Sequence, residues 1–183
     1  MIKRIKGGIA VSGILLLSLV LPATAAERVF VAKLEPNRAI LPGDVKANGV
    51  ATFRLSSDGK TVKYKVDVFG IEAVSQIHIH LGADATTPEG EHYHLPPGED
   101  HGRTVAFLLN FSPKGIKGNG TVTEGTLTAA DLSGPLRKQP MKSLVDHMAK
   151  GWSYVNIHIF QDYGSGRKYC CPAGLQGIIW PAD

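Results

Sequence analysis

The sequence predicts an all-β protein, an antiparallel sandwich or barrel that carries one short helix. Three observations lead to this prediction. Several segments alternate apolar and polar residues, which is the periodicity of a strand with one buried face. These segments recur at short intervals between Gly-rich turns, and the chain has 21 Gly and 11 Pro, a spacing typical of antiparallel sandwiches and barrels. One stretch alone breaks this pattern and shows the periodicity of an amphipathic helix.

The clearest strand is Thr61–Phe69, with the sequence TVKYKVDVF. Its valines and tyrosine fall on one face, and its lysines and aspartate fall on the other. The segment Val50–Leu55 precedes it, and Ser57-Asp58-Gly59 between them is a hairpin turn signal. The two segments are therefore expected to pair. Six further strands are expected, in chain order, at Val29–Leu34, Ser75–Leu81, Thr104–Asn110, Gly120–Leu127, Tyr154–Phe160 and Leu175–Trp180.

The one predicted helix covers Met141–Lys150. Its four large apolar residues lie at positions i, i+3, i+4 and i+7, which places them on one face. Pro140 stands at the start of the segment, and Gly151 at its end suits a C-terminal cap. We expect this helix to pack on the β domain, with its methionines as core side chains rather than metal ligands. The apolar stripe consists of Met141, Leu144, Val145 and Met148.

Residues 1–26 have the pattern of a secretory signal peptide. Three basic residues precede the apolar run Ile9–Leu21, and small residues follow it up to Ala26. The run has 13 residues, fewer than the roughly 20 that a membrane-spanning helix needs. We therefore expect cleavage, no stable membrane span, and a secreted or periplasmic protein. Residues 27–183 are then expected to form one domain.

Composition and charge exclude several classes of protein. The chain is 43% hydrophobic and 20% charged, which excludes a coiled coil and a charged disordered tail. Two cysteines cannot make a dense disulfide scaffold. The net charge of +4 falls to +1 without residues 1–26, because 17 basic and 16 acidic residues are left. Phosphate binding needs a basic patch, so nucleic acid is not an expected partner.

Histidines give the strongest functional signal, since five of the seven lie between positions 78 and 101. His78 and His80 alternate in a predicted strand, so both rings leave the same face, with Cα atoms about 7 Å apart. His158 lies in a second predicted strand and becomes a third ligand if the two strands are close. Sites rich in imidazole and poor in thiolate suit copper or zinc. His147 lies off the apolar stripe of the helix and is not included.

Two long predicted loops are rich in residues that can bind metals or carry charge. In Gly82–Gly102, His92 and His94 alternate and His101 follows, so we include all three as candidate metal ligands. Acidic residues in this loop can orient histidine rings, although a solvated loop is the better explanation for any single one of them; Asp100 is the best candidate, because it adjoins His101. The second loop, Asp162–Ala173, contains Arg167 and two adjacent cysteines. For the cysteines, an intermolecular bridge, a soft metal-ligand pair and two free thiols stay open.

Catalytic motifs of the common hydrolases and nucleotide-binding proteins are absent from the sequence. There is no G-x-S-x-G, no P-loop and no HExxH. Six other sequence blocks form a recognisable series: FVAKLEP at 30–36, Gly49–Phe53, Tyr64–Val68, QIHIHLG at 76–82, GTLTAADLSGPL at Gly125–Leu136 and GWSYVNIH at Gly151–His158. Together these blocks resemble the CHRD (chordin-type) domain family over nearly all of residues 27–183.

The histidine pattern is also similar to that of the Cu/Zn superoxide dismutases, which are Greek-key β-sandwiches. This resemblance implies a Greek-key antiparallel β-sandwich for the present chain. It implies that Arg167 corresponds to the arginine that guides superoxide. The later zinc ligands of that family have no counterpart, so the resemblance implies a copper site without a complete zinc site. It assigns the copper ligands to His78, His80 and His158, the shared ligand to His92 or His94, and a zinc ligand to His101.

Three functional hypotheses follow. The leading one is an exported CHRD-domain protein that binds copper or zinc through the clustered histidines. The second is a superoxide dismutase-like copper enzyme, in which Arg167 attracts the anion. The third is a non-catalytic structural or adhesive extracellular module, in which the histidines form a pH-sensitive surface. A metal shared by loop histidines of two chains would produce a homodimer.

Overall fold

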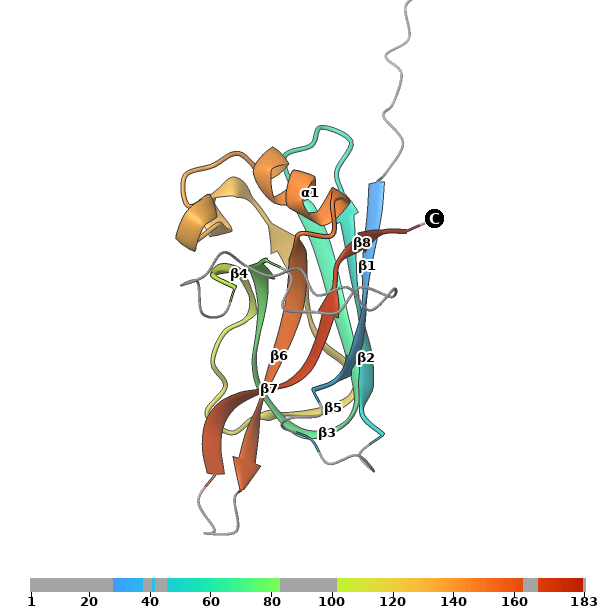
Figure 1. The fold of residues 1–183 in the computed structure, drawn as a ribbon, viewed down its shortest axis with the longest axis vertical. Coiled ribbons are helices and arrows are strands. Elements are labelled where there is room, and N and C mark those ends of the chain that lie inside the picture. Colours follow the sequence, from blue (N-terminus) through green and yellow to red (C-terminus); the bar gives the residue numbers. More distant parts are fainter. Residues whose placement is uncertain (1–27, 38–40, 42–45, 83–101, 163–167, 183) are drawn as a thin grey trace, which may run out of the picture.

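The computed structural model describes residues 28–37, 41, 46–82, 102–162 and 168–182 of the protein (Figure 1). Strands dominate this part of the chain, and one α-helix and two short 3-10 helices accompany them. The strands are β1 (Arg28–Pro36), β2 (Asn48–Leu55), β3 (Val62–Leu81), β4 (Thr104–Leu109), β5 (Ile116–Leu127), β6 (Ser153–Asp162), β7 (Lys168–Ile178) and β8 (Trp180–Pro181). The helices are η1 (Ala129–Asp131), η2 (Gly134–Leu136) and α1 (Met141–Ala149).

The strands form one antiparallel sheet that closes on itself. Its path runs β2-β1-β7-β6-β3, and β3 also pairs with β2, so these five strands make a ring. Strands β4 and β5 pair with the outer edge of β3, and β8 pairs with β1. Strand β6 returns to lie beside β3 after β4, β5 and α1, which is the long return of a Greek key. The expected all-β antiparallel architecture with one short α-helix is confirmed.

Strand β3 corrects the sequence prediction, which placed two separate strands at Thr61–Phe69 and Ser75–Leu81. The structure joins them into one long strand that bends around the end of the barrel (Figure 1). Gly70 adopts a φ of +74°, which suits glycine, and the register against β5 shifts three times between Val66 and Val74. Glycine and bulges bend a strand without ending its pairing. The first half of β3 can thus pair with β2 and the second half with β6.

The core lies inside the ring, where alternate residues of each strand point. On the expected inner face of β3, Val62, Val66 and Val68 are fully buried and Tyr64 is partly buried. Helix α1 lies over the upper end of the barrel in Figure 1, and its predicted apolar stripe is buried. Gly151 follows the helix with a φ of +66°, and any side chain there would overlap the Trp180 ring. The predicted helix and its glycine cap are therefore confirmed.

The second predicted loop, Asp162–Ala173, is also corrected by the structure. Strand β6 continues to Asp162 and β7 begins at Lys168, and the two pair as an antiparallel hairpin. The register shifts where Pro172 faces β6, because proline has no N–H to donate to the ladder. The described part of this segment is therefore strand rather than loop, with a bulge near Pro172. Among the described residues, no helix is long and apolar enough to cross a membrane.

Candidate metal site

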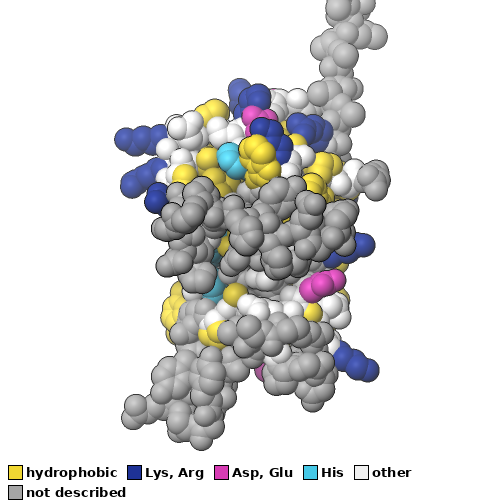
Figure 2. Space-filling view, viewed as in Figure 1, with side chains coloured by type: hydrophobic (Ala, Val, Ile, Leu, Met, Phe, Trp, Pro, Cys, Tyr) yellow, Lys and Arg dark blue, Asp and Glu magenta, His cyan; other side chains and the backbone are white. Residues whose placement is uncertain are grey.

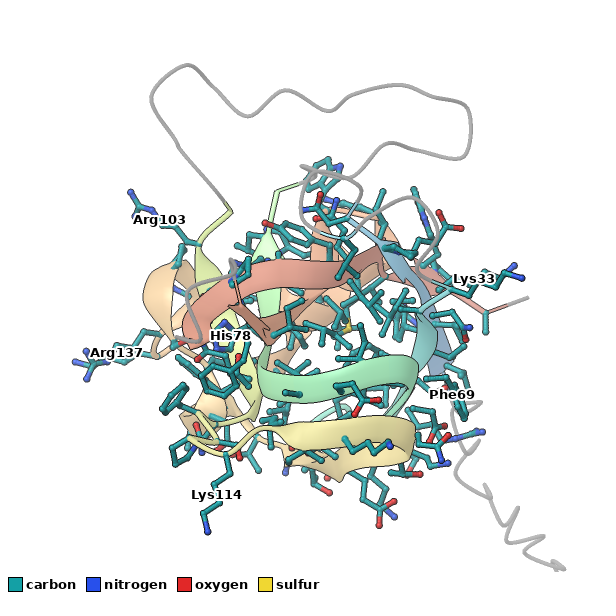
Figure 3. The ribbon with its side chains drawn as sticks, turned by 90° about the horizontal axis from the view of Figure 1, so that it is seen from below. Lys33, Phe69, His78, Arg103, Lys114 and Arg137 are labelled. Atoms are coloured by element: carbon teal, nitrogen blue, oxygen red, sulfur yellow. The ribbon has the colours of Figure 1, made fainter. Side chains whose placement is uncertain are left out.

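Three of the predicted ligands come together because β3 and β6 are hydrogen-bonded neighbours. In their antiparallel register, His78 lies opposite Asn156 and His158 lies opposite Gln76. Directly opposed residues of a strand pair project from the same face. His78, His80 and His158 therefore all leave the outer face of this pair. Figure 3 shows His78 on the side of the molecule from which Arg103 and Arg137 also project, away from Phe69.

The three rings are close enough to share one metal ion. The ring centroid of His78 lies 5.6 Å from that of His80 and 5.0 Å from that of His158, and the His80–His158 distance is 6.4 Å. One nitrogen from each ring lies within 4.8 Å of the other two. Around a four-coordinate ion with bonds of about 2.0–2.1 Å, ligand nitrogens are about 3.4 Å apart. Small side-chain rotations therefore suffice to close the three rings on an ion.

Two histidines of the cluster are buried, although they project from the face opposite the core residues Ile77 and Ile79. His78 is 7% exposed and His80 is 8% exposed. The edge of the Phe107 ring packs against His78 with centroids 4.6 Å apart, and Tyr154 stacks on His80 at 5.2 Å. On the face shown in Figure 2, little histidine surface is visible, and hydrophobic side chains lie beside it. Neighbouring aromatic rings therefore exclude water from rings that alternation alone would leave exposed.

A backbone contact fixes the tautomer of His80. Its Nδ1 atom lies 2.5 Å from the carbonyl oxygen of Gly102, at the start of the segment leading into β4. A carbonyl oxygen only accepts hydrogen bonds, so Nδ1 must donate, and in the neutral ring the Nε2 atom then holds the lone pair. That Nε2 atom is buried within the cluster. Metal-bound histidines are typically oriented by such a hydrogen bond from the second ring nitrogen.

His78 is held in its neutral form by its surroundings. Burial, together with the nearby rings of His158 and His80, lowers the pKa of His78 from 6.5 to about 4. Its Nε2 atom is buried and has no hydrogen-bond partner in the described part of the chain. Unpartnered buried polar atoms are uncommon and call for an explanation. A neutral imidazole nitrogen in this situation has the protonation state that metal ions require of a ligand.

Four predicted site residues lie outside the described residues, so their positions are not compared with the cluster. They are His92, His94, His101 and Arg167. Cys170 and Cys171 lie on β7, and their side chains are likewise not described. His147, which the sequence did not include, lies on α1, where its Nδ1 atom is 2.7 Å from the Ser143 carbonyl oxygen. It stands apart from the three-histidine cluster.

Sequence reasoning missed four residues that shape the site. Gly102 orients His80, Phe107 and Tyr154 cover the rings, and Asn156 lies opposite His78. Tyr154 and Asn156 alternate with His158 in one strand, so strand periodicity alone places them on the histidine face. No comparable signal exists for Gly102 or Phe107, because their contacts depend on how β4 pairs with β3.

The architecture and the cluster define an antiparallel all-β domain with a largely buried three-histidine cluster on the outer face of two paired strands. The family model of the CHRD domain matches residues 30–164, which is most of the chain and includes all three histidines. The chain therefore belongs to the CHRD domain family, as its sequence blocks indicated. No curated protein is similar enough to the chain to count as a match. The likeness to superoxide dismutases rests on the histidine pattern alone.

Proposed function

We propose that this protein is an exported member of the CHRD domain family that binds one copper or zinc ion through His78, His80 and His158. The main observation in support is the cluster itself, in which a nitrogen of each ring lies within 4.8 Å of the other two. The Nε2 atom of His78 gives further support, because it is buried and has no hydrogen-bond partner among the described residues. A bound ion would compensate this nitrogen for the hydrogen bonds to water that it loses on folding.

The donor set favours copper or zinc over harder cations. Three imidazoles are nitrogen ligands of intermediate softness, which suit zinc and copper, whereas magnesium and calcium prefer oxygen ligands. Three protein ligands also leave a fourth position for water or a small molecule, as in catalytic rather than structural zinc sites. His92, His94 and His101 stay predicted as additional ligands, and a homodimer bridged through them stays a prediction.

Export is part of the proposal and is supported by residues 1–26. Their basic start, short apolar run and small-residue end match a cleaved signal peptide. An extracytoplasmic location also fits histidine ligands. Outside the cytoplasm paired cysteine thiols are readily oxidised to disulfides, whereas histidine side chains are not affected in this way. Isolation of the protein from the culture medium or periplasm, followed by N-terminal sequencing, tests this step. A mature chain that begins at Glu27 is the expected result.

A dismutase-like copper enzyme is the second candidate function. The open fourth position favours it, because a redox reaction at a metal needs a place for the reactant to bind. In this case copper would supply the one-electron chemistry, while Arg167 would attract the superoxide anion electrostatically. The adhesive or structural module is less favoured, because His78 and His80 are buried rather than presented as a pH-sensitive surface.

Metal analysis of the purified, untagged protein tests the proposal directly. We expect about one copper or zinc ion per chain, and almost none in the double variant His78→Ala/His80→Ala. His147→Ala is the matched control, because it removes a histidine outside the cluster. Circular dichroism confirms that the variants fold. Full metal content in the folded double variant would contradict the site assignment.

Superoxide turnover by the copper form, compared with Arg167→Ala, separates the enzyme from a binding protein.

A further inference from the structure

Asn156 is a polar residue of the histidine face that the three-ligand site leaves unexplained. It lies in β6 directly opposite His78 and two residues before His158, so its side chain projects among the rings. Its Oδ1 atom is buried and has no hydrogen-bond partner among the described residues. A buried amide oxygen without a donor destabilises the folded state, so its presence requires a specific reason.

Neither His78 nor His80 donates a hydrogen bond to this oxygen atom. His80 uses its Nδ1 proton on the Gly102 carbonyl oxygen, so in the neutral ring its Nε2 atom carries no proton. The Nε2 atom of His78 makes no hydrogen bond within the described residues, to Asn156 or to any other group. No donor among the described residues therefore reaches the Oδ1 atom.

We propose that Asn156 Oδ1 accepts a hydrogen bond from a water molecule in the fourth coordination position of the metal ion. This inference rests on the proposed function, since it requires an ion at His78, His80 and His158. A cation makes its bound water a stronger hydrogen-bond donor, and three histidines leave one position of a four-coordinate site for that water. Asn156 is then a positioning residue that favours water over ligands without a proton to donate.

The metal-free protein provides a first test. Asn156→Leu keeps the size of the side chain and removes the unpartnered oxygen, so we expect its Tm to rise by about 3 °C in the presence of a chelator. Gln76→Leu is the matched control, because Gln76 lies on the same face, opposite His158. Its side chain has no buried unpartnered atom among the described residues, so no such rise is expected there. A lower Tm for Asn156→Leu would overturn the inference by showing an ordinary structural role.

The copper(II)-loaded protein provides a second test, with azide as the probe. Azide displaces metal-bound water and brings no proton for Asn156 Oδ1. In Asn156→Leu the bound water loses this hydrogen bond, so the affinity for azide should rise about fivefold. The visible charge-transfer band of the copper–azide complex measures the binding. Asn156→Asp should lower azide affinity below that of the wild type, because its charge stabilises the water and repels the anion. Gln76→Leu should match the wild type.

The outcomes separate this inference from the proposed function. A wild-type protein that binds no copper overturns both. One copper per chain in the wild type, with unchanged azide affinity in Asn156→Leu, overturns only the role of Asn156. A fall of tenfold or more in the copper affinity of Asn156→Leu also overturns it, because Asn156 would then be a metal ligand itself. Retained copper with tighter azide binding supports both.

Discussion

At the scale of single residues, burial sets the chemistry of the cluster. A solvated histidine has a pKa near 6.5 and is partly protonated at neutral pH. Burial and the neighbouring rings lower the pKa of His78 to about 4, so this ring is neutral over the physiological range. Metal ions bind neutral imidazole, and binding to His78 therefore does not require the release of a proton.

The lowered pKa predicts that the metal-free protein loses stability in acid. Below about pH 6.5 His78 takes up a proton in the unfolded chain, whereas in the folded protein it does so only near pH 4. Between these values the unfolded state binds more protons, so the contribution to stability is complete above pH 6.5 and falls as the pH drops. We expect His78 to lower the free energy of unfolding by about 2 kcal/mol between pH 7 and pH 4.5.

Urea unfolding with a chelator present measures this effect at the two pH values. The variant His78→Gln has no titrating group at this position, so its loss of stability in acid should be about 2 kcal/mol smaller than that of the wild type. His147→Gln, a change on α1 outside the cluster, should behave like the wild type. Equal losses in the wild type and in His78→Gln would show that another group is responsible.

At the scale of elements, the bend in β3 creates the site. Its first half pairs with β2 and its second half with β6, so one strand contributes to both sides of the barrel. This arrangement places His78 and His80 beside His158. At the end of β3, the segment that leads into β4 lies so close that Gly102 faces the Leu81 carbonyl oxygen directly. The Gly102 carbonyl can reach His80 only because of this close approach.

The close approach predicts that Gly102→Ala weakens metal binding. A Cβ atom at this position would overlap the Leu81 carbonyl oxygen and lie 2.9 Å from the Tyr154 hydroxyl, so the segment must move away. His80 then loses the acceptor that orients it, and losses of this kind lower metal affinity roughly 10–100-fold. Competition with a chromogenic chelator measures the change.

Gly59→Ala is the control for this prediction. Gly59 lies in the β2–β3 turn with a φ of +70°, and a Cβ atom added there would have no other atom within 4 Å. The substitution strains the backbone and lowers stability by about 1 kcal/mol, while metal affinity should not change. Equal metal affinities for Gly102→Ala and the wild type would show that the Gly102 carbonyl does not position His80.

The sequence predicted the elements and the core of the cluster, because strand and helix periodicities are local. Alternation identified the face of His78 and His80 and the position of His158, and helical spacing identified α1. The continuity of β3 through Gly70 was missed, because a glycine between two apolar runs resembles a turn. The burial of His78 was missed for a different reason: it depends on Phe107, which reaches the ring only through strand pairing.

At the scale of the whole molecule, the candidate site exists only in the folded chain. His78 and His158 are 80 positions apart in the sequence, and only the pairing of β3 with β6 brings them together. The unfolded chain can offer His78 and His80 as a local pair but cannot hold His158 near them at a small entropic cost. An ion that needs all three rings therefore binds the folded state much more tightly than the unfolded state.

This difference predicts that the metal raises thermal stability, and that at concentrations above Kd the gain grows with the logarithm of the free metal concentration. At a free zinc concentration of 100 times Kd, the gain is about 2.7 kcal/mol, which corresponds to a rise in Tm of roughly 5–10 °C for a chain of this size. In His158→Ala the rise should largely disappear, because the two remaining rings belong to one strand and are also available in the unfolded chain. His147→Ala should retain the full rise. Differential scanning calorimetry across a zinc titration measures all three, and a rise in His158→Ala as large as in the wild type would mean that β6 contributes no ligand.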